Sequence, residues 1–228
     1  MQISTEMISG KTQAHLSILD NMSGLADGCL LHTDVITPFL TMQEAAAKEG
    51  LNLQVASGFR SYERQLSIWN AKATGQRCLL NDNGQPIDSN SLCDTEKLYA
   101  ILRWSALPGC SRHHWGTDLD VWDSAAVADD YSLLLVPEEY QQDGPFYLLS
   151  CWLDEYAEPY GFVRPYAIDR GGVAPEPWHL SYQSIAKQFE AKLSTVFVRK
   201  ILDNSDLMLA DVAEDSLDDI WDQFICTR

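Results

Sequence analysis

Three of the chain's five histidines lie in two short segments that also carry three acidic residues. The first segment is Ser-Arg-His-His-Trp-Gly-Thr-Asp-Leu-Asp at residues 111–120, and the second is Glu-Pro-Trp-His at residues 176–179. Imidazole and carboxylate groups are common ligands of catalytic zinc, which takes three protein ligands and leaves a fourth position to water. The two segments could therefore hold one metal ion and one general base.

The spacing indicates how these residues could divide the work. His113 and Asp120 would face one ion if a turn at Gly116 folds the segment back, and His179 on a later predicted strand would complete the ligand set. Two imidazoles and one carboxylate leave a zinc site positively charged, which acidifies water and polarises a carbonyl group. Glu176 would stay unligated so that it can accept a proton and return it to a leaving amine.

Other interpretations of these residues remain open on the pattern alone. A pair of histidines beside a tryptophan also fits ordinary core packing, and no His-Glu-x-x-His helix is present. His114 is expected to support the site or to face a substrate. His15 and His32 have no partner at metal-ligand spacing and are expected to be structural. Gly171-Gly172 predicts a turn and not a phosphate loop, since no Lys-Ser/Thr helix start follows.

The motifs also resemble those of a known family. The patterns Ser-x-His-x-x-Gly-x-x-x-Asp over 111–120 and Glu-x-Trp-His over 176–179 resemble the zinc D-alanyl-D-alanine carboxypeptidases of the VanY type. This group includes the dipeptidases of vancomycin resistance and shares its fold with the hedgehog signalling domain. The stretch Ser-Gly-Phe-Arg-Ser-Tyr-x-x-Gln over 57–65 resembles the family's upstream motif. The resemblance covers about residues 51–182.

The resemblance implies a role for each matching residue. His113, Asp120 and His179 would bind one Zn²⁺ ion, and Glu176 would be the general base and acid. Arg60 would direct its guanidinium group at the scissile carbonyl oxygen or at a substrate carboxylate, tasks that suit its planar set of donors.

Further residues are expected to contact the substrate. The resemblance implies that Ser111 and Gln65 would hydrogen-bond its terminal residue, and Trp178 could line the groove. The family commonly has alanine where this chain has Asp118, which strand alternation places on the same face as Asp120. Asp118 is therefore counted among the substrate-binding candidates, although it could instead tune a ligand or pair with an arginine such as Arg112.

The predicted function is hydrolysis of a peptide bond at or near a D-amino acid in peptidoglycan precursors or fragments. Alternatives within the family are an L,D-carboxypeptidase, a free D,D-dipeptidase or an L-Ala-D-Glu-type endopeptidase. A non-catalytic metal-bearing interaction module is an alternative of another class, and a structural domain without metal is a third.

The composition narrows the possible partners and location. The formal charge of −17 argues against binding to nucleic acid or to anionic lipid. No apolar run approaches the roughly 20 residues of a membrane span, and residues 1–11 are too polar for a signal peptide. The six cysteines include no Cys-x-x-Cys pair and are expected to be reduced. These features predict a cytoplasmic protein. The partner that the resemblance implies is a small peptide or muropeptide with a D-amino acid, and the oligomeric state is left open.

The length of 228 residues predicts a single domain over 1–228, which the resemblance implies is a metallopeptidase domain. Its core is expected at about 34–200, followed by an acidic, helical C-terminal tail at 203–228. Helices and strands mix without a regular βαβ order, which favours an α+β fold with a small, mainly antiparallel sheet flanked by helices. The main elements expected are helices at about 13–21, 38–50, 61–75, 95–104, 146–156 and 185–196, and strands at 51–56, 118–122, 161–166 and 177–182.

Overall fold

A four-stranded antiparallel sheet lies at the centre of the molecule. The computed structural model describes residues 2–19, 29–203 and 206–226. The sheet order is β3-β6-β8-β7, with strands Leu53–Ser57, Asp118–Asp123, His179–Tyr182 and Phe162–Val163. Two small antiparallel pairs add β1 (Leu16–Leu19) with β2 (Cys29–His32), and β4 (Leu79–Leu80) with β5 (Pro86–Ile87). The predicted α+β class with a mainly antiparallel sheet is confirmed.

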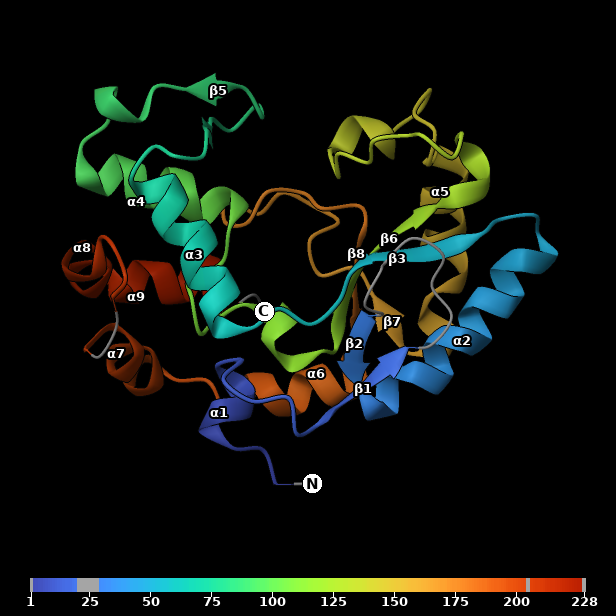
Figure 1. Cartoon of the computed structure of the whole chain (residues 1–228), viewed down its shortest axis with the longest axis horizontal. Coiled ribbons are helices and arrows are strands. Elements are labelled where there is room, and N and C mark those ends of the chain that lie inside the picture. The colour runs from blue at the N-terminus through green and yellow to red at the C-terminus, as the bar shows by residue number, and fades with distance from the viewer. Residues whose placement is uncertain (1, 20–28, 204–205, 227–228) are drawn as a thin grey trace.

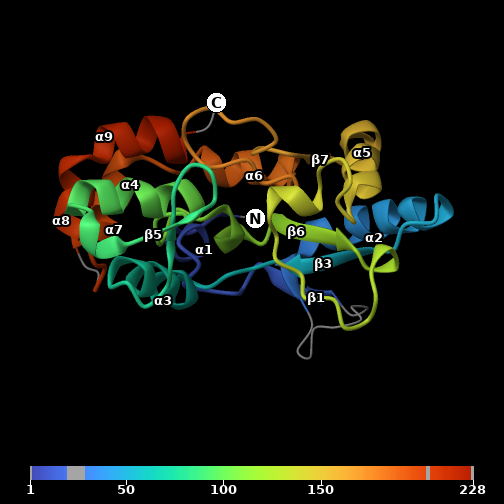
Figure 2. The same cartoon turned by 90° about the horizontal axis from the view of Figure 1, so that it is seen from above.

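The helices gather at the two ends of the molecule. In chain order they are α1 (Thr5–Ile8), α2 (Thr33–Lys48), α3 (Tyr62–Ala73), α4 (Asp94–Trp104), α5 (Tyr147–Tyr156), α6 (Gln183–Glu190), α7 (Thr195–Asp203), α8 (Ala210–Asp215) and α9 (Leu217–Ile220). Figure 1 shows α3, α4, α8 and α9 at one end and α2 and α5 beside the sheet at the other. Figure 2 shows the same division from above. None of the described helices has the length and apolar composition that crossing a bilayer requires.

Two hydrophobic clusters correspond to these two ends. Phe39 and Met42 of α2 pack in one cluster with sheet residues such as Leu119. Trp69 of α3 packs in the other cluster, which also contains Trp115. The histidine-rich segment therefore crosses from the helical cluster to the sheet cluster within four residues, and apolar contacts anchor it at both ends.

One predicted helix is wrong. The segment expected to be helical from residue 13 contains strand β1, whose Leu16 pairs with His32 and whose Leu19 pairs with Cys29. Pairing with a distant segment has overridden the local preference, as is common for short apolar stretches. Residues 20–21 of that prediction lie outside the described residues.

The start of α2 also differs from the prediction. The sequence pattern places Pro38 at the first helical position, but the helix begins at Thr33 and Pro38 lies inside it. The Nδ1 atom of His32 caps the true start by accepting a hydrogen bond of 3.2 Å from the Asp34 amide. Because Pro38 stands only in the second turn, it removes one backbone hydrogen bond without ending the helix.

The C-terminal part of the chain is more broken than expected. The helix predicted over 185–196 is two helices, α6 and α7, and Val196 is 63% exposed. The predicted helical tail is present, with Leu217 and Ile220 buried and a π-helical turn at Trp221–Ile225. None of the six cysteines, all of them in the described part of the chain, forms a disulfide. The single-domain organisation stays a prediction.

Gly116 makes the turn that the histidine motif needs. It has φ +67°, and a Cβ atom there would lie 2.7 Å from the His32 backbone nitrogen and 2.5 Å from a Leu16 methyl group. The His32 amide also donates to the Gly116 carbonyl at 2.8 Å. Glycine is therefore required both by the left-handed backbone and by the close approach of the first strand pair.

We expect Gly116→Ala to lower the free energy of unfolding by about 1–3 kcal/mol, because it adds backbone strain and a steric clash. Gly50→Ala is the matched control, since Gly50 has φ +83° but no atom within 4 Å of the position that a Cβ atom would take. Urea denaturation of both variants measures the difference. A loss no larger for Gly116→Ala than for Gly50→Ala would show that the close approach adds nothing.

Candidate active site

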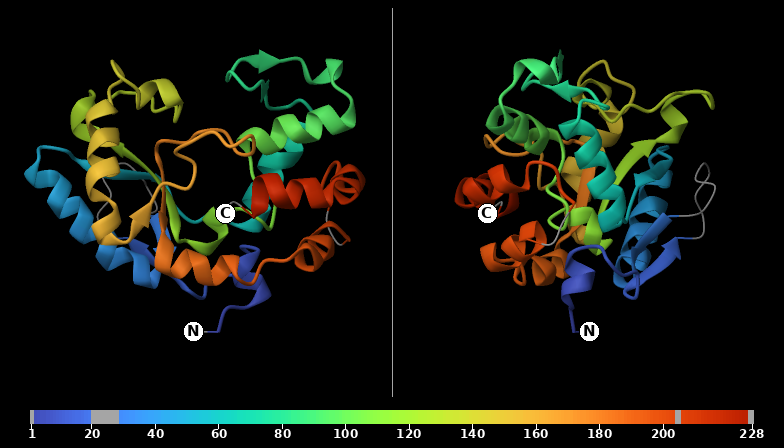
Figure 3. Two further views of the ribbon diagram at one scale, coloured as in Figure 1. Left: turned by 180° about the vertical axis from the view of Figure 1, so that it is seen from behind. Right: turned by 60° about the vertical axis from the view of Figure 1, so that its left-hand side comes forward.

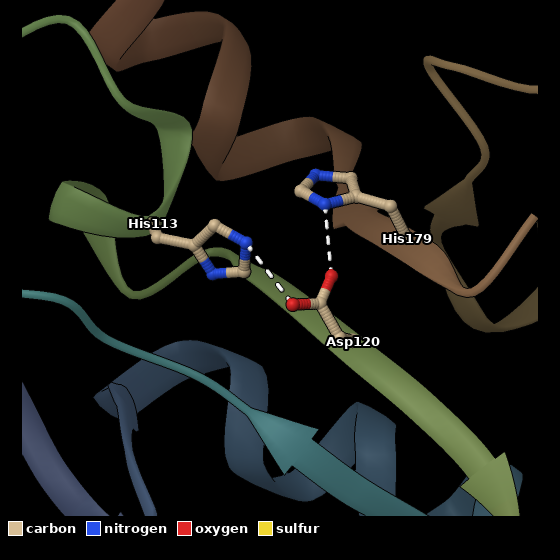
Figure 4. A group of neighbouring side chains, drawn as sticks. All are labelled: His113, Asp120 and His179. Atoms are coloured by element: carbon tan, nitrogen blue, oxygen red, sulfur yellow. Dashed lines mark hydrogen bonds and ion pairs between the residues drawn. The ribbon is translucent and has the colours of Figure 1, made fainter. Parts of the chain in front are cut away.

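Two paired strands and one short turn bring three potential metal ligands together. Asp120 on β6 pairs directly with His179 on β8. His113 lies in the 3-10 turn Arg112–Trp115 that precedes β6. One ligand atom from each of the three side chains lies within 4.8 Å of the others, and all three side chains are buried. Figure 4 shows the Asp120 carboxylate between the two imidazole rings.

The carboxylate of Asp120 contacts a different nitrogen on each ring. Its Oδ2 atom lies 3.4 Å from His113 Nε2, and its Oδ1 atom lies 3.1 Å from His179 Nδ1. The two rings are 5.0 Å apart and nearly perpendicular. Each imidazole therefore directs one nitrogen at the Asp120 carboxylate.

The opposite nitrogen of each ring is held by an acceptor. His113 Nδ1 donates to the Gly58 carbonyl at 2.8 Å, and His179 Nε2 donates to Asp118 Oδ1 at 3.0 Å. A carbonyl or carboxylate oxygen can only accept, so the proton belongs on these nitrogens. The inward nitrogens, Nε2 of His113 and Nδ1 of His179, face the Asp120 carboxylate, and a metal ion bound there would take the place of any proton that they carry.

The electrostatics of the cluster favour a cation. Burial alone would raise the pKa of Asp120, but His113 and His179 outweigh it and hold that pKa well below its usual range. Burial likewise opposes the charged form of His179, yet its bonds to Asp118 and Asp120 raise the pKa of that imidazole to about 10. Carboxylates that stabilise a proton at this point would also stabilise a metal ion, and the donor set is one that zinc accepts.

Glu176 lies beside this cluster without belonging to it. Its Oε2 atom is 3.5 Å from His179 Nδ1, and its side chain is 20% exposed. Burial raises its pKa to about 7, with His179 acting in the opposite direction. Backbone bonds fix the residue, because its amide donates to the Tyr166 carbonyl and its carbonyl accepts from the His179 amide. Such a carboxylate can take and return a proton near neutral pH.

Arg60 is held in place by two residues that follow it in the chain, Gln65 and His113. Its amide donates to the His113 carbonyl at 3.0 Å, and its Nη1 atom donates to Gln65 Oε1 at 3.0 Å. The Gln65 Nε2 atom donates to the Ala106 carbonyl at 2.7 Å, and the side chain is fully buried. Gln65 therefore orients Arg60 through bonds made within the protein, and its predicted contact with substrate stays a prediction.

Asp118 pairs with Arg112, one of the alternatives that the sequence left open. It is fully buried, and its carboxylate accepts hydrogen bonds from Arg112 Nε at 2.7 Å, from His179 Nε2 at 3.0 Å and from the Thr117 hydroxyl at 2.6 Å. These partners outweigh the effect of burial and hold the pKa of Asp118 well below its usual range. Asp118 is not among the residues that line the substrate pocket, and its contact with substrate stays a prediction.

The other histidines have structural surroundings. His114 is fully buried, donates from Nδ1 to the Arg60 carbonyl at 2.6 Å and accepts at Nε2 from the Gly109 amide at 3.0 Å. It thereby supports the backbone of Arg60. His15 and His32 are buried with their ring centroids 5.6 Å apart, away from the three-ligand cluster.

A pocket of about 220 Å³ opens onto the cluster. The candidate site residues that line it are Arg60, Ser111, His113, Asp120, Glu176, Trp178 and His179. Segments from three distant parts of the chain therefore meet around one cavity, with basic, acidic and metal-binding groups on its wall.

The C-terminal segment supplies a wall that sequence reasoning missed. Phe224 and Ile225, from the π-helical turn after α9, line the pocket together with Leu193. A Cβ atom on Gly172 would lie 1.9 Å from the Gln223 carbonyl oxygen, so the loop before Glu176 packs directly on this segment. Figure 3 shows the C-terminal end beside that loop. The apolar spacing of the tail indicates a docked helix, but not the surface on which it docks.

The chain is similar to known proteins. The family model of VanY, D-alanyl-D-alanine carboxypeptidase, matches residues 28–185. A Haemophilus influenzae protein of uncharacterised function is 44% identical over 107 residues, which cover 47% of this chain and 72% of that protein.

Two solved structures are also similar. A mutant of the vancomycin-resistance D,D-pentapeptidase VanY, in complex with Zn(II), is 26% identical with a TM-score of 0.50, and the match covers 74% of this chain and 82% of that one. The LdcB LD-carboxypeptidase, 23% identical with a TM-score of 0.56 over 90% of this chain and 80% of its own, shares the fold. With its motifs and three-ligand cluster in the matched region, the chain belongs to the VanY family of D-alanyl-D-alanine carboxypeptidases.

Proposed function

We propose that this protein binds one Zn²⁺ ion through His113, Asp120 and His179 and hydrolyses a peptide bond at or near a D-amino acid in a peptidoglycan precursor or fragment. The observation that carries the proposal is the convergence of these three ligands beside an unligated glutamate, Glu176, in one pocket. The similar VanY structure that contains Zn(II) supports the choice of metal.

The ion would provide the electrophilic part of the chemistry. When bound to this donor set, zinc lowers the pKa of water and polarises a carbonyl group. The chain's own contribution is to orient both imidazoles before the ion arrives, through the Gly58 carbonyl and the Asp118 carboxylate.

Glu176 would move the proton. It stands within 3.5 Å of a ligand nitrogen and reaches the pocket, so it can accept a proton from the attacking water and donate it to the leaving amine. A pKa raised to about 7 by burial suits both steps at neutral pH.

Arg60 would stabilise the negative charge that develops on the scissile carbonyl oxygen, or bind the substrate carboxylate. Its guanidinium lines the pocket, and Gln65 holds one of its nitrogens in place. A fixed cation acts strongly in a site from which water is largely excluded. The presence of both Arg60 and Glu176 in the pocket argues against a non-catalytic metal-bearing module.

The substrate is proposed to be a small peptide, because the cavity measures about 220 Å³. Ser111 and Trp178 line it and remain candidates for contact with the substrate's terminal residue.

A panel of D-Ala-D-Ala, muropeptides and L-Ala-D-Glu peptides separates D,D-carboxypeptidase or dipeptidase activity from L,D-carboxypeptidase and endopeptidase activities. A cytoplasmic location stays a prediction, and soluble dipeptides or recycled fragments would be suitable substrates there.

Glu176→Gln should lower kcat about 10²–10⁴-fold, since proton transfer by a positioned carboxylate contributes that much. The variant should still bind one zinc ion, because Glu176 lies outside the ligand set. Steady-state kinetics and elemental analysis of the purified protein check both expectations. Unchanged turnover would show that another group is the base.

Replacing any ligand should remove both metal and activity. Asp120→Ala and His179→Ala are expected to purify with less than about a tenth of the zinc of the wild type, because two protein ligands hold the ion poorly. His114→Ala is the neighbouring control, since His114 lies outside the cluster and should keep the ion. Retention of zinc by Asp120→Ala would contradict the assigned ligand set.

Phe224→Ala should change the choice among substrates without removing zinc. The side chain lines the pocket from a segment that contains none of the proposed ligands. Opening this wall should favour longer peptides, so the ratio of kcat/KM for a pentapeptide to that for D-Ala-D-Ala should rise several-fold. An unchanged ratio, with zinc content equal to wild type, would mean that substrates do not reach this wall.

A further inference from the structure

The two histidine ligands are held by different kinds of acceptor. His113 donates its outer N–H to the neutral Gly58 carbonyl, whereas His179 donates its outer N–H to the Asp118 carboxylate. Hydrogen bonds to a charged acceptor are roughly twice as strong as those between neutral groups. Of the two histidine ligands, His179 is therefore the one whose outer nitrogen is hydrogen-bonded to a negatively charged group.

Asp118 contacts the side of the His179 ring that faces away from the metal-binding cluster. Its Oδ1 atom lies 3.0 Å from Nε2, whereas Asp120 and Glu176 approach Nδ1 at 3.1 and 3.5 Å. The two nitrogens of an imidazole point in divergent directions. A cation held by Nδ1 is therefore out of reach of Asp118, which acts on the ion only through the ring.

Further contacts prevent Asp118 from moving. Arg112 Nε and the Thr117 hydroxyl each donate to the Asp118 carboxylate, at 2.7 and 2.6 Å. Arg112 is itself held, because its Nη2 atom donates to the Ser181 hydroxyl at 2.7 Å and its Nη1 atom pairs with Glu190. The carboxylate is thus ionised, fixed and aimed at one nitrogen.

We propose that Asp118 is a positioning residue for the metal ligand His179: it keeps the proton on Nε2, leaves Nδ1 to the ion and strengthens zinc binding through the ring. The inference rests on the proposed zinc site. It assigns to this position a role that the alanine implied there by the family resemblance could not perform, since alanine has no hydrogen-bond acceptor in its side chain.

The test is the affinity of the purified protein for Zn²⁺, measured by competition with a chelator. Asp118→Asn keeps the shape of the side chain and removes its charge, and it should raise the Kd for Zn²⁺ about 10–100-fold, as loss of such outer partners does. Asp118→Ala is avoided because it would also remove the acceptor of Arg112 Nε and of the Thr117 hydroxyl and leave a cavity, so that a loss of stability could not be separated from a loss of affinity.

Asp123→Asn is the matched control. Asp123 is a buried acid on the same strand, where its carboxylate accepts from the Asn52 and Ala125 amides at 2.8 and 3.0 Å, away from the ligands. Its loss should lower stability in thermal denaturation and leave the Kd for Zn²⁺ within about twofold.

Equal Zn²⁺ affinity of wild type and Asp118→Asn would overturn the inference while leaving the proposed function intact. An equal loss of affinity in both Asn variants would also overturn it, because the effect would then be one of general stability. A wild-type protein that binds no Zn²⁺ would instead overturn the proposed function itself, and the inference with it.

Discussion

The register between β6 and β8 is the constraint on which the site depends. Asp120 pairs with His179, and Asp118 with Ser181, across two strands that are far apart in the sequence. Side chains alternate between the two faces of a strand, so a shift by one residue would place Leu119 or Leu180 where the ligands now stand. Both leucines are fully buried in the sheet cluster, and their burial opposes such a shift.

Charge is the second requirement of this arrangement. Three carboxylates stand around one imidazole, from Asp118, Asp120 and Glu176. Buried like charges are tolerated only with compensation, which Arg112 gives on one side and Arg60 on the other. The two arginines thus offset the negative charge of these carboxylates from different sides. Arg112 lies behind the ligand His179, and Arg60 lines the pocket where substrate would bind.

Much of the site could be predicted because its residues stand in short sequence motifs. The spacing within residues 111–120, the strand expected over 118–122 and the helix expected over 61–75 depend on short stretches of sequence, and the structure forms β6 and α3 at the last two. The substrate contacts expected of Gln65 and Asp118 stay predictions, and the contacts that the structure gives these residues could not be chosen beforehand, because residue type does not show which way a polar side chain faces. Each finds its partners within the protein, through contacts that exist only once distant segments have packed.

The same reason explains the missed elements. Strand β1 exists because β2 pairs with it, which no local preference indicates. The family model matches up to residue 185, so the wall at Phe224 and Ile225 comes from a part of the chain outside the matched region. Where an amphipathic segment docks depends on the shape of a surface that the segment itself does not encode.

The close approach of Gly172 to Gln223 has a practical consequence for handling this protein. Because the segment that packs there also lines the pocket through Phe224 and Ile225, the described chain ends, at Cys226, next to the pocket wall. A purification tag attached at the C-terminal end would follow a segment that forms part of this wall. A tag placed ahead of α1 instead begins at a helix that packs beneath Trp115, whose indole nitrogen donates to the Ile8 carbonyl.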